Sequence, residues 1–392
     1  MSILITGGDG YLGWPTAVRI AARTDDRVVL VDNFARRDWV ETTGSTSAIP
    51  VLDMEARLDA ARDRLGIQNM SFVQGDLTDD AFVDEILEVH EPETVVHTAA
   101  QPSAPYSQIN GERANYTQHN NLQSTRNLLW GLSEHDLTDT HFIETTTTGV
   151  YGAPEFPIPE GGATMENQGE RDDVPFPAMA GSWYHLTKSH DAANMRLAHK
   201  QFDIPVSDVR TAITYGIETE ETAVDSRLAT RFDFDYYFGV VAHRFCAQAV
   251  AGYPMTVYGR GEQRKPFIAL EDAVEGLARL ATDGPDARPD DHVVYNQVTR
   301  AISIVEIAET IADVSEEFGL DVEVEHFENP REEDETHKME IEHDRYDELI
   351  DGQSTTFEEG VREILSILLE YEDVVTAHED RFLPGVLTGD ED

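Results

Sequence analysis

Short apolar runs alternate with amphipathic stretches along the first half of the chain. An apolar run of four to six residues predicts a strand buried on both faces, and apolar residues spaced three and four apart predict a helix. This alternation is typical of an α/β fold with a parallel sheet covered on both sides. The predicted strands are Ser2–Thr6, Val28–Val31, Ser71–Val73, Thr94–His97, His141–Glu144 and Pro205–Val209, and the predicted helices are Leu12–Arg23, Asp53–Leu65, Asp80–Val89, Ala114–Leu132 and Ser182–Lys200.

The pattern loosens after residue 210, which predicts a smaller C-terminal lobe. We expect residues 1–210 to form the main domain, residues 211–375 mainly the lobe with part of the chain returning to the sheet, and residues 376–392 an acidic tail. Segment Asn33–Pro50 indicates a surface insertion, and Gly152–Ala180 a long loop. In the lobe the pattern predicts helices Gly239–Ala251, Leu270–Thr282, Ser303–Phe318 and Phe357–Leu369 and strands Thr256–Tyr258, Val293–Gln297 and Asp321–His326.

Acidic residues outnumber basic ones by 76 to 29, giving a formal net charge of −47. Phosphate binding needs concentrated lysine and arginine, so we expect no nucleic-acid partner and no binding to anionic membranes. The excess of acid favours a halophilic protein, whose self-repulsion salt screens, over an ordinary acidic one. Without a signal peptide or a membrane-length apolar run, we expect a cytoplasmic protein. The single cysteine, Cys246, excludes an intrachain disulfide and a cysteine-cluster metal site, so we expect no metal.

A glycine-rich loop follows the first predicted strand. In TGGDGYLG, glycines Gly7, Gly10 and Gly13 are spaced three apart. Such a loop lets the backbone approach a pyrophosphate, which then rests on the N-terminus of the next helix. The strand, loop and helix in this order predict a Rossmann-type, doubly wound parallel sheet that binds a dinucleotide.

Residues after the next two strands indicate which dinucleotide is bound. Asp32 ends the second strand, where its carboxylate can accept hydrogen bonds from ribose hydroxyls, and this favours NAD over NADP. Arg36 and Arg37 leave NADP open, because they could neutralise a 2′-phosphate. Asp76 and Leu77 follow the third strand and are suited to contacting the adenine.

Tyr184 and Lys188 are the candidate catalytic pair. The chain has only four lysines, and Lys188 lies four residues after Tyr184, which places both on one helix face. An ammonium beside a phenol stabilises the phenolate and lowers the phenol pKa, which suits Tyr184 to act as general base towards a sugar hydroxyl. A threonine from TTTTGVYG, at the end of an upstream strand, can bridge substrate and tyrosine.

The glycine loop, the threonine and the YxxxK spacing together resemble extended short-chain dehydrogenases/reductases, the family of nucleotide-sugar epimerases and dehydratases. HTAAQ (97–101) and VYG (150–152) are similar to segments found across that family. Longer segments resemble its UDP-sulfoquinovose synthase branch: GGDGYLGW (7–14), VDNFARR (31–37), SAPYS (103–107), YTQHNN (116–121), SWYHLTKSHD (182–191), FDFDYYFG (232–239), RFCAQAVAG (244–252), TVYGRGEQ (256–263) and NPREE (329–333).

The resemblance implies a catalytic set of Thr147, Tyr184 and Lys188 and a substrate-binding C-terminal lobe. It implies that NAD oxidises C4 of UDP-glucose, that water leaves C6, that sulfite adds there, and that the held NADH reduces C4 again. It also implies cofactor contacts by Tyr11, Leu12, Asn33, Ala99 and Asn121, and contacts to the sugar nucleotide by Gln101, Ser103, Tyr106, His185, Gln263, Lys265, Arg331 and His337. A homodimer through the helices Ala114–Leu132 and Ser182–Lys200 is implied as well.

Three positions depart from the synthase pattern. Val150 stands where the branch has glutamate, Pro102 where it has arginine, and Lys265 where arginine is expected. The first change removes a proton donor for the C6 hydroxyl, and the second removes a cation for sulfite. His185 is a replacement candidate for the acid. A UDP-sugar 4-epimerase, which needs only the threonine, tyrosine, lysine and NAD, therefore remains the alternative, followed by a non-catalytic dinucleotide sensor.

Overall fold

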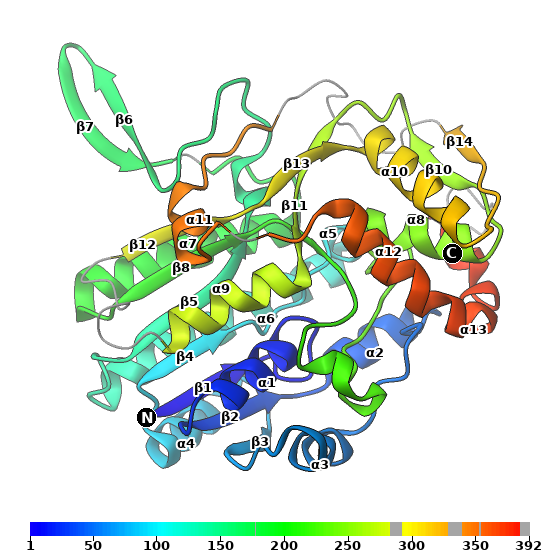
Figure 1. Cartoon of the computed structure of the whole chain (residues 1–392). Coiled ribbons are helices and arrows are strands. Elements are labelled where there is room, and N and C mark those ends of the chain that lie inside the picture. Colours follow the sequence, from blue (N-terminus) through cyan, green and yellow to red (C-terminus); the bar gives the residue numbers. More distant parts are fainter. Residues whose placement is uncertain (177, 283–291, 328–338, 353, 385–392) are drawn as a thin grey trace.

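The computed structural model describes residues 1–176, 178–282, 292–327, 339–352 and 354–384, and within them seven parallel strands form the central sheet (Figure 1). Their order is β12-β8-β5-β4-β1-β2-β3. Because the order reverses between β1 and β4, the predicted doubly wound α/β sheet is confirmed. The strands are β1 (Ser2–Thr6), β2 (Arg27–Asp32), β3 (Met70–Gln74), β4 (Thr94–His97), β5 (His141–Thr147), β8 (Val206–Thr211) and β12 (His292–Gln297).

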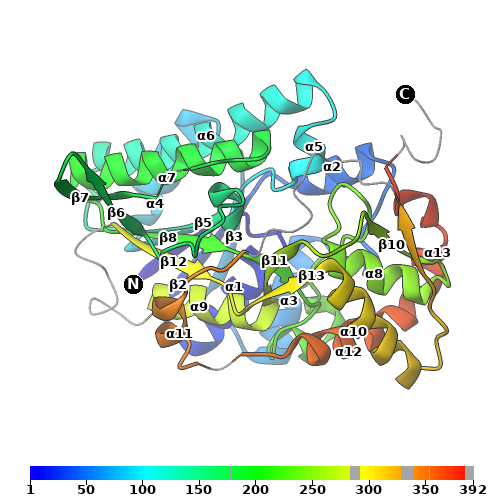
Figure 2. The same cartoon turned by 90° about the horizontal axis from the view of Figure 1, so that it is seen from above.

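Helices cover both faces of this sheet (Figure 2). Alternate strand residues pack on opposite sides: Ile3 and Ile5 lie in one apolar cluster, and Leu4 lies in the other. Side chains alternate across a strand, so a strand covered on both faces is apolar throughout. One face is covered by α1 (Gly13–Arg23), α3 (Met54–Leu65) and α9 (Leu270–Thr282), and the other by α4 (Asp80–His90), α6 (Gly111–Glu134) and α7 (Trp183–Phe202).

The C-terminal lobe packs around its own apolar core beside the sheet. It holds the three-stranded sheet β13-β11-β9 and the parallel pair β10-β14. The chain leaves the lobe through α9 and returns to the main sheet, where β12 pairs with β8. The elements are β9 (Ile213–Tyr215), α8 (Val241–Val250), β10 (Met255–Tyr258), β11 (Arg264–Ala269), β13 (Arg300–Ser303), α10 (Ile304–Glu317), β14 (Val324–Phe327), α11 (Asp344–Leu349), α12 (Phe357–Leu368) and α13 (Glu372–Thr376).

Segment Asn33–Pro50 is not the surface insertion that its sequence indicated. It contains α2 (Ala35–Thr42), and Trp39, Val40, Ala48 and Ile49 are buried. Ala48 and Ile49 join the core of the lobe, while Trp39 and Val40 pack with Tyr106 and with Phe238 of the lobe. The segment therefore connects the two parts of the molecule, and tertiary packing overrides its polar composition.

Segment Gly152–Ala180 contains a β-hairpin that the sequence pattern did not predict. Strands β6 (Gly162–Asn167) and β7 (Glu170–Pro175) pair antiparallel and project from the body of the protein (Figure 1). Gln168 and Gly169 turn the chain with φ values of 53° and 86°, the left-handed conformation that tight hairpins need. Most hairpin residues are exposed, so no apolar alternation marks them.

The C-terminal segment is packed as far as residue 384. Phe382 is buried in the core of the lobe, and the carbonyl of Arg381 accepts a hydrogen bond from the Tyr236 amide at 2.9 Å. The first part of the segment predicted as an acidic tail is therefore part of the fold. Among the described residues, no helix combines the length and the apolar character needed to cross a membrane.

Candidate active site

A large cavity opens at the carboxyl ends of the parallel strands, between the sheet and the lobe. Its volume is about 2130 Å³, whereas a pocket for one small molecule measures roughly 300–1,000 Å³. The space suits a dinucleotide and a second ligand together. Residues that follow β1, β2, β3, β4 and β8 in the wall include Gly7, Asn33, Gly75, Thr98 and Ala212.

The glycine loop can accept a pyrophosphate. Gly7 has a φ of 75°, and a Cβ at Gly7 would lie 2.8 Å from the Ala99 nitrogen. A Cβ at Gly13 would lie 2.1 Å from the Gly7 carbonyl oxygen, so only glycine permits this close packing of loop and helix. No side chain caps α1, and its first turn carries no acidic residue, which leaves its amides to an anion.

Polar residues at the ends of β2 and β3 line the part of the cavity that is predicted to hold the adenosine. The carboxylate of Asp32 accepts hydrogen bonds from the amides of Asp9 at 3.0 Å and Phe34 at 2.6 Å. Burial raises the pKa of Asp32, and these two amides oppose the shift. Asn33 donates to Asp76 at 3.1 Å, which joins the two strand ends.

The two arginines that left NADP open are both held by carboxylates. Arg36 donates to Asp233 at 2.6 Å, and its guanidinium lies 4.1 Å from the centre of the Phe238 ring. Arg37 makes a two-pronged contact with Asp9, at 2.7 and 2.8 Å, and does not line the cavity. Because these carboxylates neutralise the arginines, the wall favours NAD over NADP.

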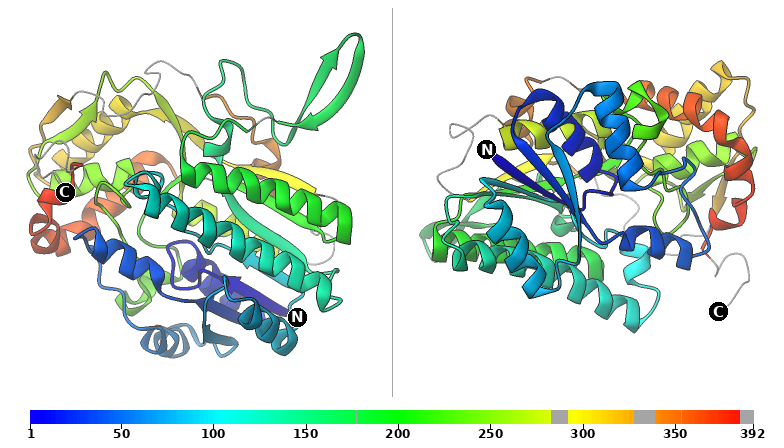
Figure 3. Two further views of the ribbon diagram at one scale, coloured as in Figure 1. Left: turned by 180° about the vertical axis from the view of Figure 1, so that it is seen from behind. Right: turned by 90° about the horizontal axis from the view of Figure 1, so that it is seen from below.

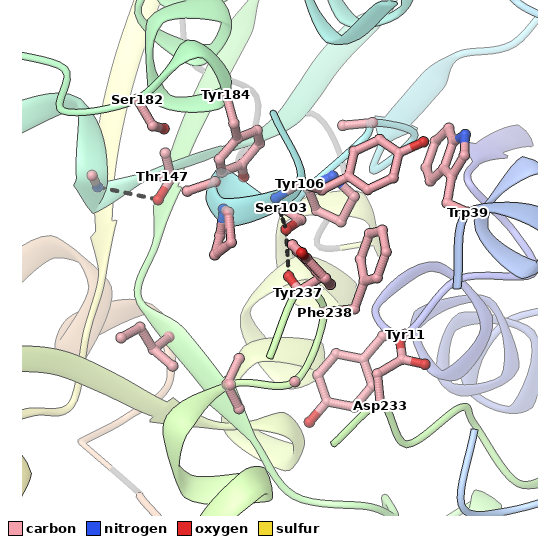
Figure 4. Close-up of a pocket in the computed structure, with 18 of the residues that line it drawn as sticks. Tyr11, Trp39, Ser103, Tyr106, Thr147, Ser182, Tyr184, Asp233, Tyr237 and Phe238 are labelled. Atoms are coloured by element: carbon pink, nitrogen blue, oxygen red, sulfur yellow. Dashed lines mark hydrogen bonds between the residues drawn. The ribbon is translucent and has the colours of Figure 1, made fainter. Parts of the chain in front are cut away.

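Tyr184 and Thr147 both line the cavity (Figure 4). Strand β5 runs three residues beyond its predicted end, so Thr147 is its last residue. The Thr147 hydroxyl accepts a hydrogen bond from the Gly149 amide at 3.1 Å. Ser182 caps α7, which positions Tyr184 in the first turn, and the Tyr184 amide donates to the Ser107 hydroxyl at 3.2 Å.

Lys188 is buried one turn below Tyr184. Its ammonium donates to Glu144 at 3.0 Å and lies 3.9 Å from Asp191. Burial alone would lower the pKa of Lys188, but Glu144 and Asp191 outweigh it, and the pKa is raised. The side chain is therefore a permanent cation.

The sequence predicted that Lys188 lowers the pKa of Tyr184, and this prediction is wrong for the protein without a bound ligand. Burial raises the pKa of Tyr184, and the charge on Lys188 offsets only part of that shift. Asp191 and Glu144 raise it further. Sequence spacing revealed the lysine but not the two carboxylates that surround it.

His185 and the predicted substrate residues surround the rest of the cavity. The His185 ring packs against Gly149, where a Cβ would lie 2.4 Å from it. Ser103 donates to the Tyr237 carbonyl, which ties the loop after β4 to the lobe (Figure 4). The predicted residues in the wall are Gly7, Gly10, Tyr11, Leu12, Gly13, Asp32, Asn33, Arg36, Asp76, Leu77, Ala99, Ser103, Tyr106, Thr147, Tyr184, His185, Lys188, Gln263 and Lys265.

Gln101 and Asn121 lie behind the wall. The Asn121 side chain accepts from the Gln101 amide at 2.8 Å and donates to the Gln101 carbonyl at 3.1 Å and to Thr187 at 3.0 Å. It therefore fixes the loop after β4 against α7. Arg331 and His337 lie outside the described residues.

Sequence reasoning missed part of the lobe wall. Arg231, Asp233, Tyr236, His243 and Arg244 line the cavity from the segment around FDFDYYFG, a motif that had been noted only for its resemblance. Glu144 was also missed, although a charged residue inside the apolar strand sequence HFIETTT is a usable signal.

Comparison with known proteins identifies the family. Residues 3–296 match the model of the NAD dependent epimerase/dehydratase family. The chain is 40% identical over 339 residues to the UDP-sulfoquinovose synthase of Sulfolobus acidocaldarius, covering 86% of this chain and 84% of that protein. It is 36% identical over 373 residues to the chloroplastic UDP-sulfoquinovose synthase of Spinacia oleracea, covering 95% of this chain and 76% of that protein.

Solved structures agree on the fold. The UDP-glucose 4-epimerase of Thermotoga maritima, solved with UDP-glucose, has a TM-score of 0.68 at 19% identity, covering 94% of this chain and 99% of that one. The UDP-glucuronic acid 4-epimerase of Bacillus cereus, solved with its sugar nucleotide and NAD, has the same TM-score, identity and coverage. The chain belongs to the NAD-dependent epimerase/dehydratase family, whose cofactor fits the glycine loop and Asp32 described above.

Proposed function

We propose that this protein is a UDP-sulfoquinovose synthase-type enzyme, which converts UDP-glucose and sulfite to a sugar nucleotide that carries a sulfonate at C6. One observation carries the proposal: two UDP-sulfoquinovose synthases are 36% and 40% identical to this chain over most of its length. The gathering of Thr147, Tyr184 and Lys188 around one cavity supports it.

Tyr184 is the base in the proposed mechanism. Bound NAD would supply the redox chemistry, in which a hydride is removed from C4 of the sugar and is later returned to it. Tyr184 takes the proton of the C4 hydroxyl, and Thr147 orients that hydroxyl. Lys188 stabilises the phenolate, and the positive charge of oxidised NAD would add to this stabilisation if the cofactor were bound. Tyr184 gives the proton back when C4 is reduced.

The C6 step needs an acid, and position 150 does not supply it. Val150 is buried in an apolar cluster with Tyr151, Ile158 and Phe176, behind the cavity wall. His185 is the acid that we propose instead, because its ring lines the cavity against Gly149 at the end of β5. A ketone at C4 makes the C5 hydrogen acidic, so that His185 can take this proton and give it to the departing C6 hydroxyl, which leaves as water.

Cations in the lobe wall are suited to the anionic parts of the substrates. Arg244 and Lys265 line the cavity, and Gln263 adds an amide there. We propose that this end holds the diphosphate and sulfite. Arginine binds such oxyanions through paired N–H groups, whereas lysine acts as a point charge.

A UDP-sugar 4-epimerase is the second candidate, favoured by the apolar surroundings of Val150. To separate the two, the purified protein is incubated with UDP-glucose and NAD in concentrated salt, with and without sulfite. The products are resolved by chromatography and mass spectrometry. A sulfonated sugar nucleotide that forms only with sulfite supports the synthase. UDP-galactose formed without sulfite would instead identify an epimerase.

We also propose a homodimer that forms through α6 and α7, which run side by side across one face of the molecule (Figure 3). Trp130 on α6 and Leu197 on α7 are 46% and 58% exposed, and these two apolar side chains on adjacent helices would be covered by such a contact. The net charge supports concentrated salt in a cytoplasm as the working medium. Light scattering after size-exclusion chromatography in high salt tests the dimer, and Leu197→Glu should yield monomers.

A further inference from the structure

Three ionisable side chains lie buried together beneath Tyr184. Glu144 on β5 and Asp191 on α7 are fully buried, and Lys188 is 2% exposed. Lys188 donates to one oxygen of Glu144 at 3.0 Å, while its distance to Asp191 is 3.9 Å. We call these three residues the lysine cluster. It contains two carboxylates for one ammonium.

Other polar groups around the lysine cluster do not supply a second cation. Thr125 on α6 contacts Glu144 at 3.5 Å and also contacts His97 on β4 at 3.2 Å. Burial lowers the pKa of His97 well below its ordinary value, so the imidazole is neutral. The nearest guanidinium on β8, that of Arg210, is bound by Asp208 at 3.0 Å.

The carboxylates of the lysine cluster are under-satisfied. The second oxygen of Glu144 and both oxygens of Asp191 are buried without a well-formed hydrogen bond, and only Thr125 and the opposite carboxyl group lie close enough to Asp191 to act as weak partners. A buried carboxylate without a donor is costly, and two neighbouring carboxylates in a dry interior do not both ionise beside one cation. Burial raises the pKa of both groups, and for Asp191 the charge of Glu144 raises it further. Asp191, the carboxyl farther from the ammonium, is the one that keeps a proton.

We propose that Asp191 is a protonated carboxylic acid in the resting enzyme and that Glu144 is the ionised partner of Lys188, so that the lysine cluster stores one proton and has no net charge. Both are positioning residues that act through Lys188, and their role rests on the proposed function of Tyr184 as base. A second negative charge in the cluster would oppose the Tyr184 phenolate. The stored proton removes that charge while Glu144 holds the ammonium in place.

The proposal makes a distinctive prediction for single and double variants. In Asp191→Asn the cluster stays neutral. In Glu144→Gln, Asp191 loses its proton and replaces Glu144 as counter-ion, so the cluster again stays neutral. Each single variant should therefore leave the ionisation of Tyr184 nearly unchanged. The double variant leaves Lys188 without a counter-ion, which should lower the Tyr184 pKa by about one to three units.

The experiment measures carboxyl and phenol ionisation directly, without sugar substrate. The infrared difference spectrum of the wild-type protein minus Asp191→Asn, both with NAD at neutral pH, should show the C=O band of a buried carboxylic acid. Burial also raises the pKa of Glu363 to about 7, but its band is present in both proteins and cancels in the difference. Ultraviolet difference titration against Tyr184→Phe should give the same phenol pKa for the wild type and both single variants, and a lower one for the double variant. Circular dichroism verifies folding.

Two results would overturn the proposal: absence of the carboxylic acid band from the difference spectrum, or a lowered Tyr184 pKa in each single variant. Either means that both carboxylates are ionised at rest. If Asp191→Asn does not fold, the phenol titration of Glu144→Gln still tests the proposal. Because neither readout needs turnover, failure of the sulfite reaction and failure of this inference can be told apart.

Discussion

Two buried aspartates of this protein have opposite electrostatic surroundings. Asp191 lies with Glu144 beside a single ammonium, and its pKa is raised well above the ordinary value, first by burial and then by Glu144. Asp233, on the lobe side of the cavity, accepts hydrogen bonds from Arg36 at 2.6 Å and from Arg231 at 2.9 and 3.0 Å. Burial opposes ionisation of Asp233 too, but the two arginines outweigh it and hold its pKa well below the ordinary range.

The comparison shows that the ratio of charges, rather than burial, decides which state a carboxyl adopts here. Carboxylates outnumber cations around Lys188, so a proton is retained close to the reacting groups. Two arginines donate hydrogen bonds directly to Asp233, so that aspartate is a structural anion joining α2 to the lobe. In a chain with 76 acidic residues, paired arginines are what allow a buried anion to remain ionised.

The largest effect should come from replacing Tyr184, the phenol above the lysine cluster. Tyr184→Phe should reduce kcat about 10²–10⁴-fold, because the general base is removed. NAD affinity, measured by calorimetry, should stay within a few-fold of the wild type. Unaltered turnover would remove the base assignment and favour a non-catalytic dinucleotide binder.

Two matched substitutions test whether Asp233 and Asp191 contribute differently to the free energy of unfolding. Asp233→Asn leaves two buried arginines without their anion, which should cost about 3–5 kcal/mol in the free energy of unfolding. Asp191→Asn replaces a protonated carboxyl with a neutral amide and should cost less than about 1 kcal/mol. Urea unfolding in high salt measures both. Equal losses would contradict the proposed difference in ionisation.

The pH dependence of stability should have opposite signs for the two aspartates. The Asp233 pKa is lower in the folded protein, so its contribution is present above the unfolded pKa of about 3.9 and is lost as the pH falls towards the folded value. The Asp191 pKa is higher in the folded protein, so its contribution is lost as the pH rises from about 3.9 towards the folded value. The free energy of unfolding is measured for the wild type and for each Asn variant across this pH range. Subtracting the values of a variant from those of the wild type gives the pH dependence that the replaced aspartate contributes.

The smallest effect concerns cofactor choice. Asp233→Asn removes the anion that neutralises Arg36, so NADP affinity relative to NAD should rise by about three- to fivefold, the scale of a partly exposed ion pair. Calorimetry with both dinucleotides measures the ratio. Asp191→Asn, which leaves Arg36 and Asp233 intact, is the control. No change in the ratio would show that Asp32 alone sets the preference.

Much of the fold was predictable because buried parallel strands are apolar throughout. β1 and β4 match their predicted bounds residue for residue, and α9 does too. The hairpin of β6 and β7 was missed because its residues are exposed and follow no apolar period. Strands β9, β11 and β13 were missed because their pairing depends on contacts that are distant in sequence.

The candidate site was predictable where its parts are local in sequence. The glycine spacing and the four-residue interval between Tyr184 and Lys188 follow from loop and helix geometry. The contacts of Lys188 with Glu144, 44 positions away, and of Arg36 with Asp233, 197 positions away, arise only from the tertiary fold. For that reason the direction of the Tyr184 pKa shift could not be inferred from the sequence.

The central claim is that this site oxidises a sugar carbon and reduces the same carbon again within one turnover. UDP-glucose deuterated at C4 tests it most directly, with the product from the sulfite reaction analysed by mass spectrometry. We predict that the product keeps its deuterium at C4 even when a large excess of unlabelled NADH is added. Loss of the label to the free nicotinamide pool, or its replacement by hydrogen, would contradict the account.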